Sequence, residues 1–129
     1  MIFTFITQMK NYLIIGYGWL GKALAAELKS EGINIWASTS DVHKLSEIQA
    51  NGFFGIPVAK TNQILSWKKL PETHFDKVII TLPPFEGVLE SLNNLLNTLS
   101  YSQLVFTSST GVYVESDSLI NESSAVDES

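Results

Sequence analysis

The stretch that decides the fold is Leu13-Ile-Ile-Gly-Tyr-Gly-Trp-Leu-Gly21. Residues 12–15 form a short continuous apolar run, which is typical of a strand buried on both faces. The run ends in glycines spaced Gly-x-Gly-x-x-Gly, and an apolar pattern at helical spacing follows as far as Leu28. A glycine motif between a buried strand and a helix predicts a βαβ unit with a ligand at the turn.

Each glycine of this motif has a mechanical role in binding a dinucleotide. Gly16 permits the tight turn out of the strand, Gly18 lets the backbone approach a pyrophosphate, and Gly21 allows the helix to pack closely. The N–H groups and dipole of the first helical turn attract an anion, so Trp19 and Leu20 are expected to take part. The sequence therefore predicts a dinucleotide cofactor at this loop.

The rest of the chain alternates between strand and helix patterns. Further strands are expected at 33–37, 53–58, 77–82 and 103–107. One helix is expected after Asp41, while residues 59–76 show no regular pattern. The last helix is expected to turn an apolar face inward that consists of Val88, Leu89, Leu92, Leu95, Leu96 and Leu99.

This alternation predicts an α/β fold, namely a Rossmann-type doubly wound parallel sheet of about five strands. With the strands numbered along the chain, the expected order is 3-2-1-4-5, and the alternative is the flavodoxin-like order 2-1-3-4-5. The glycine motif favours the first. The domain is expected at 9–114, after an N-terminal extension at 1–8 (alternatively an additional edge strand) and before an acidic flexible tail at 115–129.

Composition restricts the classes of partner. The chain has 129 residues, no cysteine and a formal net charge of −5. An acidic chain is a poor match for nucleic acid, and no apolar run approaches the roughly 20 residues of a membrane span. The absence of cysteine excludes a disulfide scaffold and is compatible with a reducing compartment, so we expect a cytoplasmic protein.

The end of the second strand bears on the choice of cofactor. It carries three hydroxyl side chains, Ser38, Thr39 and Ser40. Asp41 follows at about the spacing of an acid that binds the adenosine ribose of NAD, but its place before a helix favours an N-cap role. The hydroxyls, together with His43 and Lys44, could accept a ribose 2′-phosphate. The sequence thus favours NADP over NAD.

Two further strand ends complete the predicted site. Leu82 and Pro83 lie at the tip of the fourth strand and are expected to form a wall beside the cofactor, although the prolines could simply end the strand. Four hydroxyl residues, 107–110, end the fifth strand. Ser108 is expected at the cofactor, and a hydroxyl here could bind a substrate oxygen or merely cap the strand.

The glycine loop and the run Val105-Phe-Thr-Ser-Ser-Thr-Gly-Val-Tyr113 together resemble extended or atypical short-chain dehydrogenases, the NAD(P)-dependent epimerase/dehydratase family. The resemblance covers nearly the whole chain from Met9. It implies that Ser109 is the catalytic hydroxyl that polarises the substrate oxygen, with Ser108 and Thr110 as near-register alternatives. It also implies an oxidoreductase or epimerase that acts on a small carbonyl or sugar-like substrate.

The family's catalytic Tyr-x-x-x-Lys pair does not occur in these 129 residues. We therefore expect this chain to be an N-terminal, catalytically incomplete part of such an enzyme, which would need a longer chain to bind its substrate. The rival hypothesis is a non-catalytic nucleotide-sensing or protein-interaction domain. His43 and His74 are isolated and have no metal-ligand spacing, so no metal is expected. The sequence leaves homo-oligomerisation open.

Overall fold

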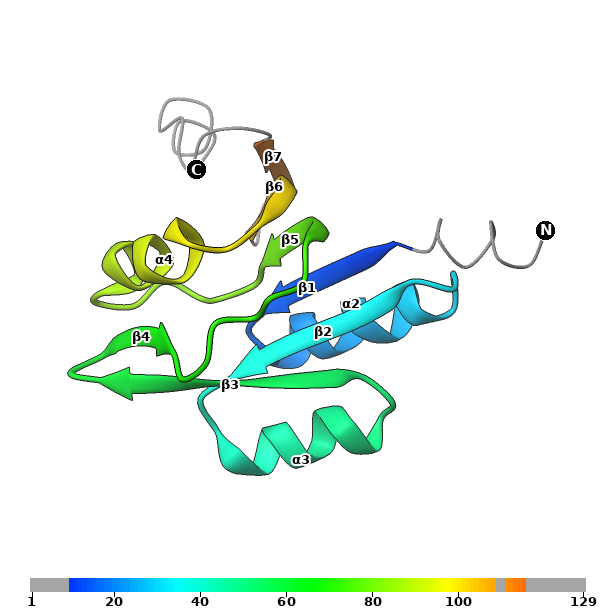
Figure 1. Cartoon of the computed structure of the whole chain (residues 1–129), viewed down its shortest axis with the longest axis horizontal. Coiled ribbons are helices and arrows are strands. Elements are labelled where there is room, and N and C mark those ends of the chain that lie inside the picture. The colour runs from blue at the N-terminus through cyan, green and yellow to red at the C-terminus, as the bar shows by residue number, and fades with distance from the viewer. Residues whose placement is uncertain (1–9, 109–110, 116–129) are drawn as a thin grey trace.

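The computed structural model describes residues 10–108 and 111–115. The elements in chain order are β1 (Asn11–Ile15), α2 (Trp19–Lys29), β2 (Asn34–Thr39), α3 (Val42–Ala50), β3 (Phe54–Thr61), β4 (Ile64–Trp67), β5 (Phe75–Ile80), α4 (Val88–Asn97), β6 (Tyr101–Ser108) and β7 (Gly111–Glu115). Figure 1 shows that α2 and α3 begin on the side toward which the arrowheads of β1 and β2 point. That side is the carboxyl edge of the sheet.

The strands form a seven-stranded sheet in the order β4-β3-β2-β1-β5-β6-β7. Its five inner strands, β3, β2, β1, β5 and β6, run parallel. They correspond to the five strands expected from the sequence, and their order confirms the Rossmann arrangement over the flavodoxin-like alternative. β1 lies in the middle, where Tyr12 pairs with Ile35 on one side and Lys77 on the other.

Helices cover both faces of this sheet. Successive side chains of a strand point to opposite faces. Ile14 therefore belongs to a core with Ala25 of α2 and Ile48 of α3, whereas Leu13 belongs to a second core with Leu95 of α4. A central strand that is buried on both sides accounts for the unbroken apolar run at residues 12–15.

β4 is an antiparallel edge strand within a segment that the sequence prediction left irregular. Asn62 and Gln63 join it to β3, and both have left-handed backbones, with φ of 52° and 71°. Such a two-residue connection matches the twist of a hairpin. β7 was also missed: it pairs antiparallel with β6, with Ser108 opposite Gly111.

The inward face of α4 differs from its prediction. Ser91, Leu92, Leu95 and Leu96 are buried, but Leu89, which was expected to face inward, is 67% exposed. Consecutive residues lie about 100° apart on a helix, and Val88 and Ser91 occupy the inward face at this end of α4. Ser91 is buried because its Oγ accepts a 2.9 Å hydrogen bond from the Leu65 N–H on the outer edge of β4.

β7 ends at Glu115, next to the predicted boundary between the domain at 9–114 and the tail at 115–129, and these boundaries stay a prediction. The predicted N-terminal extension and the remainder of the predicted tail lie outside the described residues. Within the part of the chain that the structure describes, no helix is long and apolar enough to cross a membrane.

Candidate functional site

The turn between β1 and α2 has the geometry predicted for its first glycine. Gly16 has a left-handed backbone with φ of +106°, which a side chain would strain. Its N–H donates a 3.3 Å hydrogen bond to the carbonyl of Ser38. A Cβ at Gly16 would lie 2.8 Å from Thr81 Oγ1 and 3.1 Å from Leu82 Cδ2. The turn is therefore held against the ends of both β2 and β5.

The other two glycines of the motif have opposite surroundings. A Cβ at Gly21 would collide with the carbonyl oxygen of Gly16, so this glycine lets α2 approach the turn closely. A Cβ at Gly18 would meet nothing within 4 Å. Gly18 is the N-cap of α2, and its carbonyl accepts from Lys22 N–H at 2.9 Å. The space over Gly18 is open to a ligand.

The first turn of α2 supplies the chemistry for an anion. Helix geometry leaves the first-turn N–H groups without acceptors inside the helix, and these groups carry the positive end of the helix dipole. Trp19, Leu20 and Gly21 form this turn, which contains no acidic residue. Their N–H groups lie beside the open space at Gly18. The arrangement fits a phosphate or pyrophosphate group.

Thr81 ties the end of β5 to the glycine loop, a role that sequence reasoning missed. Its N–H donates to the Ile15 carbonyl at 3.0 Å, and its Oγ1 lies 3.1 Å from the carbonyl oxygens of both Ile15 and Gly16. Leu82 and Pro83 follow directly. The predicted wall is therefore attached to the loop through the side-chain and main-chain hydrogen bonds of Thr81. Leu82 is half-buried and Pro83 is exposed.

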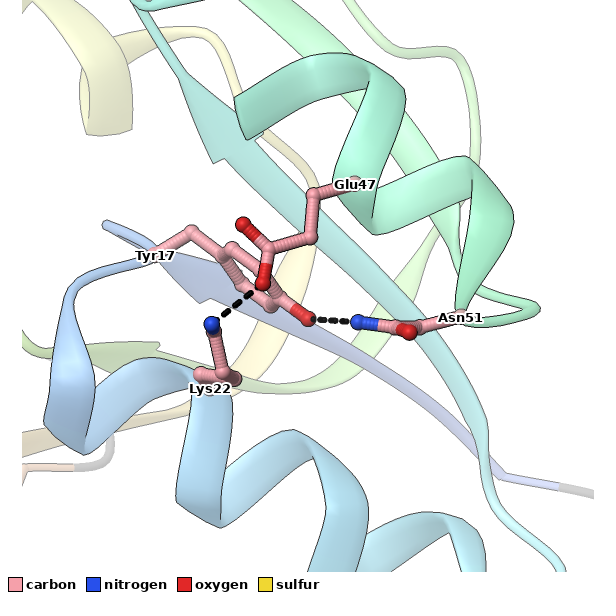
Figure 2. Close-up of polar contacts among 4 residues, drawn as sticks. All are labelled: Tyr17, Lys22, Glu47 and Asn51. Carbon is pink, nitrogen blue, oxygen red and sulfur yellow. Dashed lines mark hydrogen bonds and ion pairs between the residues drawn. The ribbon is translucent and has the colours of Figure 1, made fainter. Parts of the chain in front are cut away.

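Tyr17, between the first two glycines, connects the loop to Asn51 at the end of α3 (Figure 2). Its ring is 3% exposed, and its hydroxyl accepts a 3.0 Å hydrogen bond from Asn51 Nδ2, just beyond α3. Lys22 of α2 forms an ion pair with Glu47 of α3 beside it. The hydrogen bond and charge of Glu47 raise the pKa of Lys22. These contacts couple the position of the loop to that of α3.

At the end of β2, Asp41 has the N-cap role that the sequence favoured. Its Oδ1 accepts from the N–H groups of His43 at 2.8 Å and Lys44 at 3.4 Å. These two hydrogen bonds lower the pKa of Asp41. Thr39 Oγ1 accepts from the Asp41 N–H at 3.1 Å, while Ser40 is exposed. The carboxylate is thus directed at the start of α3.

The strand order brings most of the predicted site residues to one edge. The strand order β2-β1-β5-β6 places Ser38–Ser40 on one side of the glycine loop, and Leu82 and Ser108 on the other. Thr107 Oγ1 donates to the Ile80 carbonyl at 2.9 Å, which ties the end of β6 to β5. Ser109 and Thr110 lie outside the described residues, so the position of the predicted catalytic hydroxyl remains a prediction. Among residues 10–108 and 111–115, no three His, Cys, Asp or Glu residues gather as metal ligands.

The comparison with protein families shows the family of the chain. Residues 11–127 match the model of the NAD binding domain of 6-phosphogluconate dehydrogenase. The chain belongs to this family of NAD-binding domains. The described geometry of the NAD-binding domain agrees with that membership, since its glycine loop, helix start and strand ends lie together at one edge of a Rossmann-type sheet.

Solved structures support the fold of the NAD-binding domain. One of them, "SsCR_L211H", is similar over 80% of this chain with a TM-score of 0.53 and 15% sequence identity. Identity this low bears on the fold alone. The NAD-binding domain spans 38% of that chain's length. No curated protein matches the sequence.

Proposed function

We propose that this NAD-binding domain holds the cofactor of an oxidoreductase or epimerase that resembles the extended or atypical short-chain dehydrogenases. The observation that carries the proposal is the open space over Gly18 at the N-cap of α2, next to the N–H groups of the first turn. That combination allows a pyrophosphate to approach the backbone directly and to accept its hydrogen bonds.

Each part of the edge then has a role. The N–H groups of Trp19, Leu20 and Gly21 bind the pyrophosphate, while the segment 38–40 contacts the adenosine ribose. Leu82, Pro83 and Ser108 lie toward the other half of the dinucleotide, because β5 and β6 follow β1 in the sheet. In an open parallel sheet the two halves of a dinucleotide lie on either side of such a switch point.

The proposed reaction requires more than these residues. When bound, the nicotinamide supplies hydride transfer. The hydroxyl of Ser109 donates to the substrate oxygen, where negative charge develops. The Tyr-x-x-x-Lys pair of the resembled family does not occur in this sequence. The proposal for these 129 residues is therefore cofactor binding without turnover.

We also propose NADP as the preferred cofactor. Ser40, His43 and Lys44 are exposed beside the adenosine end and offer donors to a 2′-phosphate. The carboxylate of Asp41 opposes this preference, since it occupies the N–H groups of His43 and Lys44. Lys44→Ala should weaken NADPH binding about tenfold while leaving NADH within about twofold, as measured by titration calorimetry. An equal loss for both cofactors would contradict the preference.

The cofactor proposal is tested by thermal unfolding with NADH and NADPH. At ten times its Kd, a ligand adds about 1.4 kcal/mol to the free energy of unfolding, which raises the Tm of a domain of this size by roughly 5–6 °C. Gly18→Val should abolish this shift without a clash in the unliganded protein, since a Cβ there meets nothing. Gly32→Ala is the control, because α2 ends before it: its left-handed backbone (φ of +79°) should lower the starting Tm, but the shift on adding cofactor should remain. If millimolar NADH and NADPH leave the wild-type Tm unchanged, the proposed function is wrong.

A further inference from the structure

Large hydrophobic side chains are exposed at an unexpected place in this domain. Within the described residues they are Trp19, Val42, Phe54, Leu70 and Leu89. Three of the five lie in the first turn of a helix: Trp19 in α2, Val42 in α3 and Leu89 in α4. We call these three side chains the apolar rim.

The topology gathers the apolar rim at the ligand edge. α2 follows β1, α3 follows β2 and α4 follows β5, and these three strands are neighbours in the order β2-β1-β5. α2 and α3 begin directly after β1 and β2, on the carboxyl side of the sheet (Figure 1). Trp19 and Val42 therefore lie at the same edge as the glycine loop. α4 begins only at Val88, after β5 has ended at Ile80, and its N-cap Gly87 lies beside Gln63 and Ile64, so Leu89 lies farther out on this side.

Trp19 is the most exposed of the rim, at 83%. Two residues correspond to about 200° around a helix, so Trp19 points almost opposite to Gly21, which is buried against Gly16. Side chains of a helix also lean toward its N-terminus. The indole thus projects off the sheet beside the open space at Gly18. Packing of the fold does not account for it, since α2 contributes Ala25 and not Trp19 to the core.

We propose that the indole of Trp19 covers the pyrophosphate of the bound dinucleotide and the ribose next to it. This inference rests on the proposed function and deepens it. The rim places an apolar side chain in the first turn of each of three helices, close to the N–H groups of that turn. A dinucleotide likewise carries apolar rings and sugar faces close to its charged phosphates. An indole over the phosphates excludes water from their bonds to the N–H groups of the first turn, and such bonds are stronger in a less polar environment.

The test compares Trp19→Ala with wild type by titration of NADH, ADP-ribose and AMP. ADP-ribose retains the pyrophosphate and both riboses but has no nicotinamide, whereas AMP has no pyrophosphate. A Trp side chain buries 150–250 Å² when covered, so even partial cover predicts about tenfold weaker binding of the variant. The loss should be equal for NADH and ADP-ribose and smaller for AMP, which retains only one phosphate and one ribose. Ala favours helix and Trp19 is exposed, so the variant should fold.

Fluorescence gives a second readout. ADP-ribose does not absorb the emission of tryptophan, so a blue shift on its binding reports that an exposed indole has been covered. The shift should be present in wild type and lost in Trp19→Phe, because Trp36 and Trp67 are already packed against the core. Phe54→Ala is the matched control: Phe54 is an aromatic residue, 53% exposed, at the amino end of β3. Because Phe54 stacks on Trp36, with 4.6 Å between the ring centroids, the starting emission will change, but the affinity and the blue shift on ADP-ribose binding should not.

The outcomes separate the two proposals. If the wild type binds none of NADH, NADPH and ADP-ribose, the proposed function fails. If it binds them and Trp19→Ala binds within about twofold of wild type, the cover is wrong while the function stands. A loss confined to NADH would place the indole on the nicotinamide and also overturn the cover. So would a Trp19→Ala variant that binds normally but has lost self-association, measured by sedimentation, since a second copy would then occupy the rim.

Discussion

Gly18→Asp should change stability and cofactor binding in opposite directions. Gly18 is the N-cap of α2, with φ of −82° and ψ of −161°, a backbone that any residue can adopt. Asp is a better N-cap than Gly by a few tenths of a kcal/mol, and its charge interacts favourably with the helix dipole by about 0.3–1 kcal/mol. No neighbouring atom obstructs the new side chain at its Cβ. The unliganded variant should therefore unfold about 1–6 °C higher than wild type.

The same carboxylate should oppose the cofactor. At roughly 5 Å from a phosphate and an effective dielectric of about 20, the repulsion is about 3 kcal/mol, and solvent exposure reduces it to about half. NADH and NADPH should then bind roughly 10- to 100-fold more weakly. Scanning calorimetry gives the first quantity and titration calorimetry the second. Gly18→Asn is the control: it caps α2 equally well without the charge, so it should show only the capping part of the gain in Tm and lose less affinity.

Two results would refute this reasoning. A Gly18→Asp variant that binds NADH within threefold of wild type would mean that no anion lies at the start of α2. A variant with a lower Tm than wild type would mean that Gly18 does not have the N-cap geometry described, and the role of the first turn would have to be reconsidered.

Three other substitutions test the surroundings of the site. Thr81→Val removes the hydroxyl that bonds the carbonyl of Gly16, so it should lower the free energy of unfolding by about 1 kcal/mol in urea and weaken NADH binding, while Thr81→Ser should restore both. Ser91→Ala leaves the buried N–H of Leu65 without its acceptor and should cost about 1–3 kcal/mol in urea, with cofactor affinity unchanged. Because the pKa of Asp41 is lowered in the folded state, its stabilising effect is complete above its ordinary pKa and is lost as the pH falls through the folded value; Asp41→Asn should therefore flatten the Tm profile below about pH 4 in a pH series.

The parallel strands could be predicted because a strand that is buried on both faces consists of a continuous run of apolar residues. Residues 12–15 are apolar without interruption, as β1 requires in the middle of the sheet. β4 has no such continuous apolar run. Its outer edge is satisfied by side chains of α4 that lie far along the chain, through the hydrogen bonds of Leu65 with Ser91 and Asn94. The same contacts explain why a serine, and not Leu89, is buried on α4.

Within the site, the predicted glycines act through their own backbone conformation. Tyr17 and Thr81, which the sequence analysis missed, act through partners that lie far along the chain. The spacing of the glycines was enough to predict the turn and the helix start. The motif allows any residue at position 17, and only the structure shows that Tyr17 bonds Asn51 and packs edge-on against Phe53. Thr81 likewise reads as the last residue of a strand, and only the sheet order shows that its hydroxyl reaches the loop after β1.

The three glycines of the loop differ in why a glycine is present, and the difference bears directly on function. Gly16 is required by its left-handed backbone, and Gly21 is required because any Cβ would collide with the Gly16 carbonyl. Neither requirement depends on a ligand. Gly18 satisfies no such requirement, since its backbone is extended and its surroundings are empty. Stability alone would favour Ser, Asp or Asn at an N-cap. A residue that the fold does not need, at a position where another residue would stabilise the helix, supports the proposed cofactor site, since a pyrophosphate there would come closer to the backbone than a side chain allows.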